Sequence, residues 1–271
     1  MRAISTAPVM VEKIIAEDNH SDFLQNLRQY LGGCSSSDAL LFVHGFNVDF
    51  VSAILRTAQI AADLNFPGAS LLFSWPSKGA LSLLAYTHDE EQARWALRDL
   101  REFLELVAEE SGATTIHLLA HSMGNQALTE ALGRIGADTS RRSGKIFNEI
   151  VLTAPDIDTD TFVHDIAPAI VPTAKRVTLY ASSKDVALAF SKTVHGYDRA
   201  GESGEKIVLL DGVDTIDVSA IDTSLVGHSY SGDNRSVISD MFYLIKGQAA
   251  TDRFGLKKRT KNRRPYWVFQ P

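Results

Sequence analysis

The stretch TIHLLAHSMGN, residues 115–125, decides the fold of this chain. Its first half, Thr115–Leu119, is a continuous apolar run that predicts a buried strand, and a helical pattern follows directly. Ala120 and Gly124 stand two residues before and two after Ser122. A serine held in a sharp strand-to-helix turn needs small residues at those positions, although alanine replaces the usual first glycine. The stretch therefore predicts a nucleophile elbow at Ser122, with an ordinary helix N-cap serine as the alternative.

Apolar runs alternate with amphipathic stretches on both sides of this turn. Strands are predicted at 39–43, 70–74, 115–119, 149–152, 176–180 and 206–210, and helices at 51–64, 89–109, 125–134 and 235–245. Continuous apolar strands are typical of a parallel sheet covered on both faces. The rhythm predicts a single-domain α/β fold, with a doubly wound, mostly parallel sheet flanked by helices and no large cap domain.

Composition limits the class of protein. The chain has 271 residues, a hydrophobic share of 45% and a formal net charge of −6, which suit a globular protein and argue against nucleic acid as a partner. Cys34 is the single cysteine, and no Cys/His cluster has metal-site spacing, so we expect neither a metal nor another cofactor. No run of about 18 apolar residues and no signal peptide is found, so we expect no membrane span and a cytoplasmic location. The sequence does not indicate an oligomeric state.

The end of the chain differs in composition. We expect the domain to cover residues 1–250, with the segment 1–37 outside its motifs, and a basic tail with an aromatic end at 251–271. The cations are Lys257, Lys258, Arg259, Lys261, Arg263 and Arg264. We expect a solvated segment whose aromatic end docks on the domain, with binding to acidic lipid or nucleic acid as the alternative.

A serine nucleophile needs a base and an acid that orients the base, and in this architecture the acid precedes the base along the chain. Asp185 follows the strand at 176–180 and is the preferred acid, while Asp156, which follows the preceding strand, is the alternative. His228 lies after the last strand and before the last helix, and is the preferred base over His195.

Two backbone N–H groups are expected to form an oxyanion hole. One belongs to Met123, the residue after the nucleophile, and the other to Phe46, in the turn that follows the first strand. Gly45 gives that turn its conformational freedom. His44 and His121 flank the two turns, and we expect both to be structural.

Five short motifs occur in order: VHGFNV (43–48), FSWPS (73–77), HSMGN (121–125), APDID (154–158) and GHSY (227–230). Together they resemble a bacterial α/β-hydrolase family, largely of unknown function, over about residues 38–246. The resemblance implies the hydrolase fold and the triad Ser122, Asp185 and His228. It implies no particular substrate.

The function expected from these residues is hydrolysis of small carboxylic esters with short to medium acyl chains, through an acyl-enzyme. Amidase, thioesterase or lactonase chemistry on the same site is the alternative, as is a non-catalytic binding protein of the same fold. The segment after the second strand is expected to line the substrate entrance, with Trp75, Leu81, Leu84 and Tyr86 as lining residues and plain packing as the alternative.

Overall fold

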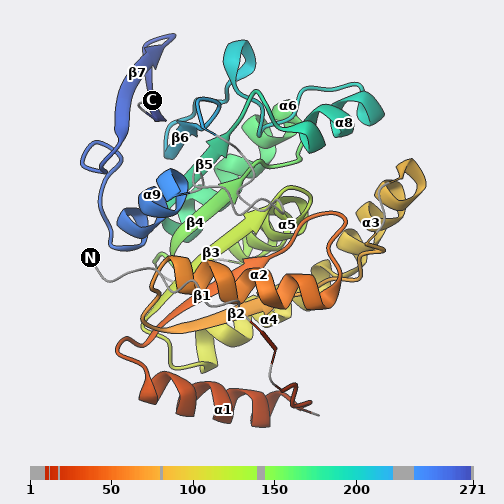
Figure 1. Ribbon diagram of the computed structural model, residues 1–271, viewed down its shortest axis with the longest axis vertical. Coiled ribbons are helices and arrows are strands. Elements are labelled where there is room, and N and C mark those ends of the chain that lie inside the picture. Colours follow the sequence, from red (N-terminus) through yellow and green to blue (C-terminus); the bar gives the residue numbers. More distant parts are fainter. Residues whose placement is uncertain are drawn as a thin grey trace.

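Among the described residues, an eight-stranded sheet in the order β2-β1-β3-β4-β5-β6-β8-β7 forms the centre of the computed structural model (Figure 1). The strands are β1 Asp38–Val43, β2 Ala69–Phe73, β3 Thr115–His121, β4 Phe147–Thr153, β5 Ala174–Ala181, β6 Val213–Asp217, β7 Leu256–Lys261 and β8 Arg264–Phe269. Every pairing is parallel except that of β7 with β8. The structure describes residues 10–11, 13–17, 19–79, 82–138, 144–221 and 235–269.

The strand order reverses beside β1. The chain passes from β1 to β2 on one side and then returns to place β3 on the other side of β1. Connections that leave in opposite directions open a crevice at the carboxyl ends of the two strands, where open α/β sheets bind their ligands. The switch point therefore lies between the turn after β1 and the turn after β3, which contains Ser122.

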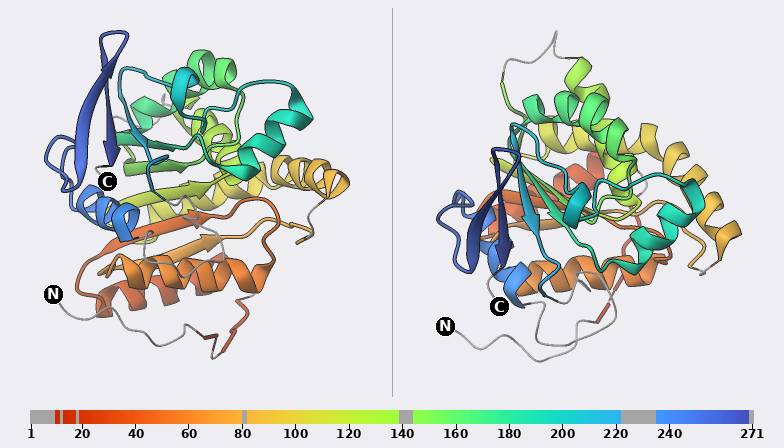
Figure 2. Two further views of the ribbon diagram at one scale, coloured as in Figure 1. Left: turned by 45° about the horizontal axis from the view of Figure 1, so that its top comes forward. Right: turned by 90° about the horizontal axis from the view of Figure 1, so that it is seen from above.

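Helices cover both faces of the sheet (Figure 2). They are α1 His20–Gly33, α2 Phe50–Asp63, α3 Leu83–Trp95, α4 Leu97–Glu110, α5 Gly124–Ala137, α6 Thr159–Thr161, α7 Ala167–Ile170, α8 Val186–His195 and α9 Arg235–Ile245, with short η turns at Phe162–Ile166, Val171–Thr173 and Gly204–Lys206. Residues of α1, α3, α4, α5 and α7 pack on one face, and residues of α2 and α9 pack on the other.

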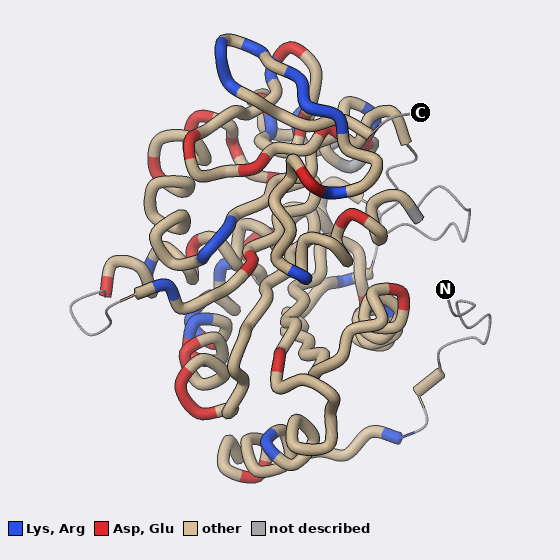
Figure 3. The backbone as a smooth tube through the Cα atoms, turned by 90° about the vertical axis from the view of Figure 1, so that its left-hand side faces the viewer, with Lys and Arg blue, Asp and Glu red and all other residues tan. Residues whose placement is uncertain are grey.

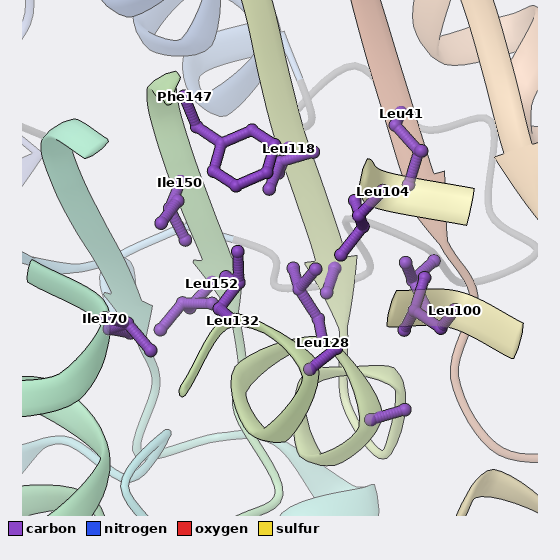
Figure 4. Packing of buried hydrophobic residues seen from close by; sticks show 14 of the residues in the cluster. Leu41, Leu100, Leu104, Leu118, Leu128, Leu132, Phe147, Ile150, Leu152 and Ile170 are labelled. Atoms are coloured by element: carbon purple, nitrogen blue, oxygen red, sulfur yellow. The ribbon is translucent and has the colours of Figure 1, made fainter. Parts of the chain in front are cut away.

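The larger core lies on the α5 face. Leu118 of β3, Leu152 of β4, and Leu128 and Leu132 of α5 all belong to this core and are fully buried. Figure 4 shows Leu152 beside Leu132 and Leu118 beside Phe147. Each buried leucine side chain contributes about 1.5–3 kcal/mol relative to an exposed one. This packing fixes α5 against the sheet, and with it the turn that joins β3 to α5.

The doubly wound α/β architecture is confirmed, and two predicted elements are corrected. The last strand of the prediction, 206–210, is wrong: the chain pairs with β5 through β6 instead, and Val208 is buried as a loop residue whose carbonyl accepts a hydrogen bond from Thr215. The run 206–210 is apolar because Ile207 and Val208 are buried in a loop, and this apolar character resembled that of a strand. The single helix at 89–109 is two helices, because Ala96, with a ψ of −6°, ends α3 and starts α4.

The basic C-terminal segment forms the β7–β8 hairpin at the edge of the sheet. Its aromatic end docks: Trp267 pairs with Ile216 of β6, and Trp267 and Phe269 are buried. Figure 3 shows the run of Lys and Arg along the hairpin. Lys261 and Arg264 donate hydrogen bonds to carbonyls of residues 204–209, while the other cations of β7 are exposed.

Candidate active site

Ser122 occupies a strained turn at the switch point. Its φ is +49°, in the left-handed region that a residue with a Cβ rarely adopts. The residue lies between the end of β3 and the start of α5, its N–H donates to the carbonyl of Thr153 at 3.0 Å, and it is 5% exposed. Strain of this kind costs about 1–3 kcal/mol and persists only where the surroundings enforce it.

Two glycines let the turn after β1 pack against the elbow. A Cβ atom on Gly124 would lie 2.3 Å from the carbonyl oxygen of His44. A Cβ atom on Gly45 would lie 3.0 Å from the Cβ atom of Ser122. Both approaches are too close for any larger residue, so the two turns meet at van der Waals distance. Phe46 and Met123, the predicted oxyanion donors, therefore lie in turns that are in contact.

Asn125 braces the turn at Ser122 through two hydrogen bonds, a role that the sequence pattern did not predict. Its side-chain amide donates to the carbonyls of Ser122, at 2.9 Å, and Thr153, at 3.1 Å, and the residue is fully buried. Thr153 in turn donates its hydroxyl to the carbonyl of Ala120 at 2.8 Å. The sequence feature that could have indicated this role is an amide side chain in the first turn of an otherwise apolar helix.

His44 and Trp75 fix the turn after β1. The Nδ1 of His44 lies 2.9 Å from the carbonyl of Gly45, so Nδ1 carries the proton and Nε2 accepts from the hydroxyl of Ser74 at 3.1 Å. Trp75 donates its indole N–H to the carbonyl of His44 at 2.8 Å and stacks on the imidazole. Burial lowers the pKa of His44, and burial lowers the pKa of His121 to about 3, so both rings are neutral at neutral pH.

Asp185, the preferred acid, lies at the start of α8. It is the N-cap of that helix and accepts the N–H of Leu188 at 2.9 Å, and its side chain is half-buried. The loop that carries it is tied to the end of β6, because the N–H of Ser183 donates to the hydroxyl of Ser219 at 2.8 Å. His228, the preferred base, lies outside the described residues, in the connection between β6 and α9.

Asp156, the alternative acid, is buried and fully engaged. Its carboxylate accepts hydrogen bonds from Tyr86 and Ser191 and forms an ion pair with Arg199. His195, the alternative base, donates from Nδ1 to the carbonyl of Ser191 at 3.0 Å. Its Nε2 lies 3.5 Å from the carboxylate of Glu90 on α3.

The expected lining residues differ in exposure. Trp75 and Tyr86 are each 2% exposed, because their polar atoms are hydrogen-bonded inside the fold. Leu84 at the start of α3 is 80% exposed, and Leu81 lies outside the described residues. Of the three described members, Leu84 alone presents its side chain to solvent.

A cavity of about 210 Å³ adjoins the turn after β1. Its lining is mostly polar and comes from the end of β1, the turn after it, the first half of α2 and the segment after β2: Phe42, His44, Asn47, Val48, Asp49, Ser52, Arg56 and Gly79. Asn47 has a φ of +59°, so it adds a second left-handed residue near the switch point.

The described part of the chain offers neither a cluster of metal-binding residues nor a membrane-spanning helix. No group of three or more His, Cys, Asp or Glu residues there is arranged to hold a metal ion. None of the helices in that part combines the length and the apolar character that crossing a membrane requires.

Comparison with solved structures gives partial matches to esterases. One of two fungal esterases from Rhizomucor miehei is 12% identical over 79% of this chain and 74% of that chain, with a TM-score of 0.47. Esterase Pf2001 of Pyrococcus furiosus is 11% identical over 79% of this chain and 84% of that chain, with a TM-score of 0.43. A cold-adapted esterase from an Arctic intertidal metagenomic library is 16% identical over 72% of this chain and 78% of that chain, with a TM-score of 0.41. Similarity at this level carries no argument about substrate.

No curated protein matches the chain significantly. The profile of a protein family described as "Alpha/beta hydrolase of unknown function (DUF900)" matches residues 19–246, which is most of the chain and includes both turns of the site. With the parallel sheet, the switch point and the strained elbow already in place, this match shows that the chain belongs to that family of α/β hydrolases.

Proposed function

We propose that the protein is a serine carboxylesterase in which Ser122 is the nucleophile, His228 the base and Asp185 the acid. The observation that carries the proposal is the strained backbone of Ser122 at the switch point, packed against Gly45. A helix N-cap serine has no need of a left-handed backbone, because a capping residue normally has extended dihedrals. Family membership supports the same reading.

In this mechanism His228 takes the hydroxyl proton of Ser122 as the oxygen attacks an ester carbonyl carbon. Asp185 keeps the imidazole in the required tautomer and stabilises the imidazolium. The N–H groups of Phe46 and Met123 donate to the oxyanion, at the N-terminal end of α5, where the helix dipole also favours negative charge. The protonated His228 gives its proton to the departing alcohol, and water then cleaves the acyl-enzyme by the same steps.

Burial and hydrogen bonding favour Asp185 over Asp156 as the acid. Asp156 is 1% exposed and both of its carboxylate oxygens already accept from buried donors. A triad acid must offer an oxygen to the base. Asp185 is half-buried, and its loop is tied to the end of β6, which begins the connection that carries His228.

The chain length of the substrate is proposed from the sequence and from one exposed side chain. Among the described lining candidates, Leu84 at the start of α3 is exposed, and we propose that it contacts the acyl chain. The cavity of about 210 Å³ beside the turn after β1 has none of Ser122, Phe46 and Met123 in its lining, so its volume sets no limit on the substrate. We propose esters with short to medium acyl chains as the substrates.

The test is hydrolysis of p-nitrophenyl esters from acetate to decanoate by the wild type and by Ser122→Ala. We expect turnover that declines for the longest chains and a loss of about 10⁴-fold or more in Ser122→Ala. Ser111→Ala, which alters another buried serine at the end of α4, is the matched control and should keep wild-type activity. Equal activity of the wild type and Ser122→Ala would refute the proposal, and a preference for anilide, thioester or lactone substrates would redirect it.

A further inference from the structure

The carboxylate of Asp156 is the centre of a buried hydrogen-bond network beside the site. The hydroxyl of Tyr86 donates to Oδ2 at 2.6 Å, the hydroxyl of Ser191 donates to Oδ1, and the Nε of Arg199 lies 3.2 Å from Oδ1. All four residues are between 0% and 4% exposed. Arg199 balances the charge of Asp156, which a buried carboxylate requires.

Two of these partners, Tyr86 and Ser191, connect the carboxylate to parts of the proposed machinery. The ring of Tyr86, on α3, meets the ring of Phe46 edge to face at 5.3 Å between centroids. Ser191 is on α8, the helix whose N-cap is Asp185. A single carboxylate therefore connects the oxyanion turn and the helix that carries the acid.

The backbone of Asp156 makes the third connection, to the elbow itself. Its N–H donates to the carbonyl of Ser122 at 3.4 Å, and its carbonyl accepts from the side chain of Gln126 at 2.7 Å. Burial and the carboxylate of Asp156 raise the pKa of Tyr86, so its hydroxyl stays protonated and donates to Asp156.

We propose that Asp156, with Tyr86 and Ser191, is a positioning group that fixes the acid-bearing helix and the oxyanion turn relative to Ser122. This inference rests on the proposed function. Displacement of a catalytic group by about 1 Å costs on the order of 100-fold in rate. Loss of one hydrogen bond of the network is therefore expected to lower kcat more than it changes KM, because the displaced groups act on the transition state.

The first test compares three hydroxyl deletions. Tyr86→Phe and Ser191→Ala should each lower kcat about tenfold with KM within twofold of the wild type. Tyr180→Phe is the matched control, because its hydroxyl donates to buried Asp240 at 2.5 Å on the opposite face of the sheet. The control should lower the melting temperature by a similar amount and leave kcat unchanged. An equal loss of kcat in Tyr180→Phe, or wild-type kcat in both site variants, would overturn the inference.

The second test separates positioning from acid catalysis. Removal of a triad acid costs about 10⁴-fold in kcat. Asp185→Asn should show a loss of that size, and Asp156→Asn a loss of about 10- to 100-fold. The reverse order would make Asp156 the working acid and end the proposal. If Asp156→Asn does not fold because Arg199 loses its ion-pair partner, the kcat values of Tyr86→Phe and Ser191→Ala still test the positioning role.

The two proposals fail in different ways. A folded wild type that hydrolyses none of the esters refutes the proposed function. A wild type that hydrolyses esters through Ser122, while Tyr86→Phe and Ser191→Ala retain full kcat, refutes the positioning role alone.

Discussion

For single residues, the strained turn at Ser122 was predictable because its constraint is local. Ser122 needs small neighbours at two fixed positions, and Ala120 and Gly124 supply them within five residues of chain. The supports of the elbow were not predictable. Asn125 reaches Thr153, 28 residues away, and Tyr86 reaches Ser191, 105 residues away. Hydrogen bonds over such separations depend on the finished fold and leave no spacing pattern in the sequence.

Two glycines of α5 give a paired prediction. In Gly124→Ala the new methyl group would meet backbone carbonyls of β1 and the residue after it, which cannot move, so we expect a loss of about 3 kcal/mol or more in unfolding free energy. In Gly133→Ala the nearest atom is 3.7 Å away, and a gain of about 0.5–1 kcal/mol is expected. Urea denaturation measures both. A Gly124→Ala protein as stable as the wild type would contradict the packing of the two turns.

At the scale of elements, apolar runs identified five of the six predicted strands correctly, because parallel strands covered on both faces are continuous in hydrophobicity. The sixth failed because Ile207 and Val208 are buried without belonging to the sheet, whereas β6 reads VDTID, with acidic residues that do not suggest a buried strand. The split at Ala96 was missed because alanine favours a continuous helix.

Buried Glu149, which lies opposite Arg176 where β4 pairs with β5, predicts how stability depends on pH. Burial raises the pKa of Glu149 from 4.5 to about 7. Between pH 4.5 and about 7 the folded state therefore keeps a proton on Glu149 that the unfolded chain loses. As a result, the contribution of Glu149 to the free energy of unfolding falls as the pH rises from about 4.5 to about 7. The fall should be roughly 3 kcal/mol. Glu149→Gln should remove that part of the decline.

Urea titrations of the wild type and Glu149→Gln at several pH values between 4 and 8 measure the difference. Asp240, whose pKa burial raises to about 6, contributes a similar slope in both proteins and cancels in the comparison. Parallel stability curves for the two proteins would show that Glu149 is ionised in the fold at pH 6.

At the scale of the whole molecule, composition and strand rhythm predicted the architecture, while the role of the C-terminal hairpin came from the structure. Its cations dominated the sequence pattern, but β8 continues the sheet beyond β6 and its aromatic side chains complete the α9 face. The exposed cations of β7 stand on an edge strand, where charge discourages pairing with other chains.

Truncation after Arg253 tests the structural role of the hairpin and keeps the buried ion pair of Arg253 with Asp240. The truncated chain should have a lower melting temperature and a tendency to aggregate, because it loses the buried Trp267 and Phe269 and exposes the edge of β6. The triple variant Lys257→Gln, Lys258→Gln, Arg259→Gln is the control, with stability expected within about 0.5 kcal/mol of the wild type. An unchanged melting temperature in the truncated chain would mean that the hairpin adds nothing to the core.

Fluorophosphonates react with activated serines, so labelling of the folded protein followed by peptide mapping tests whether Ser122 is an activated nucleophile. We expect one adduct, on Ser122, that forms faster than on free serine, is absent in Ser122→Ala and persists in Ser111→Ala. An unlabelled Ser122 in protein shown to be folded, or an adduct at another residue, would contradict it.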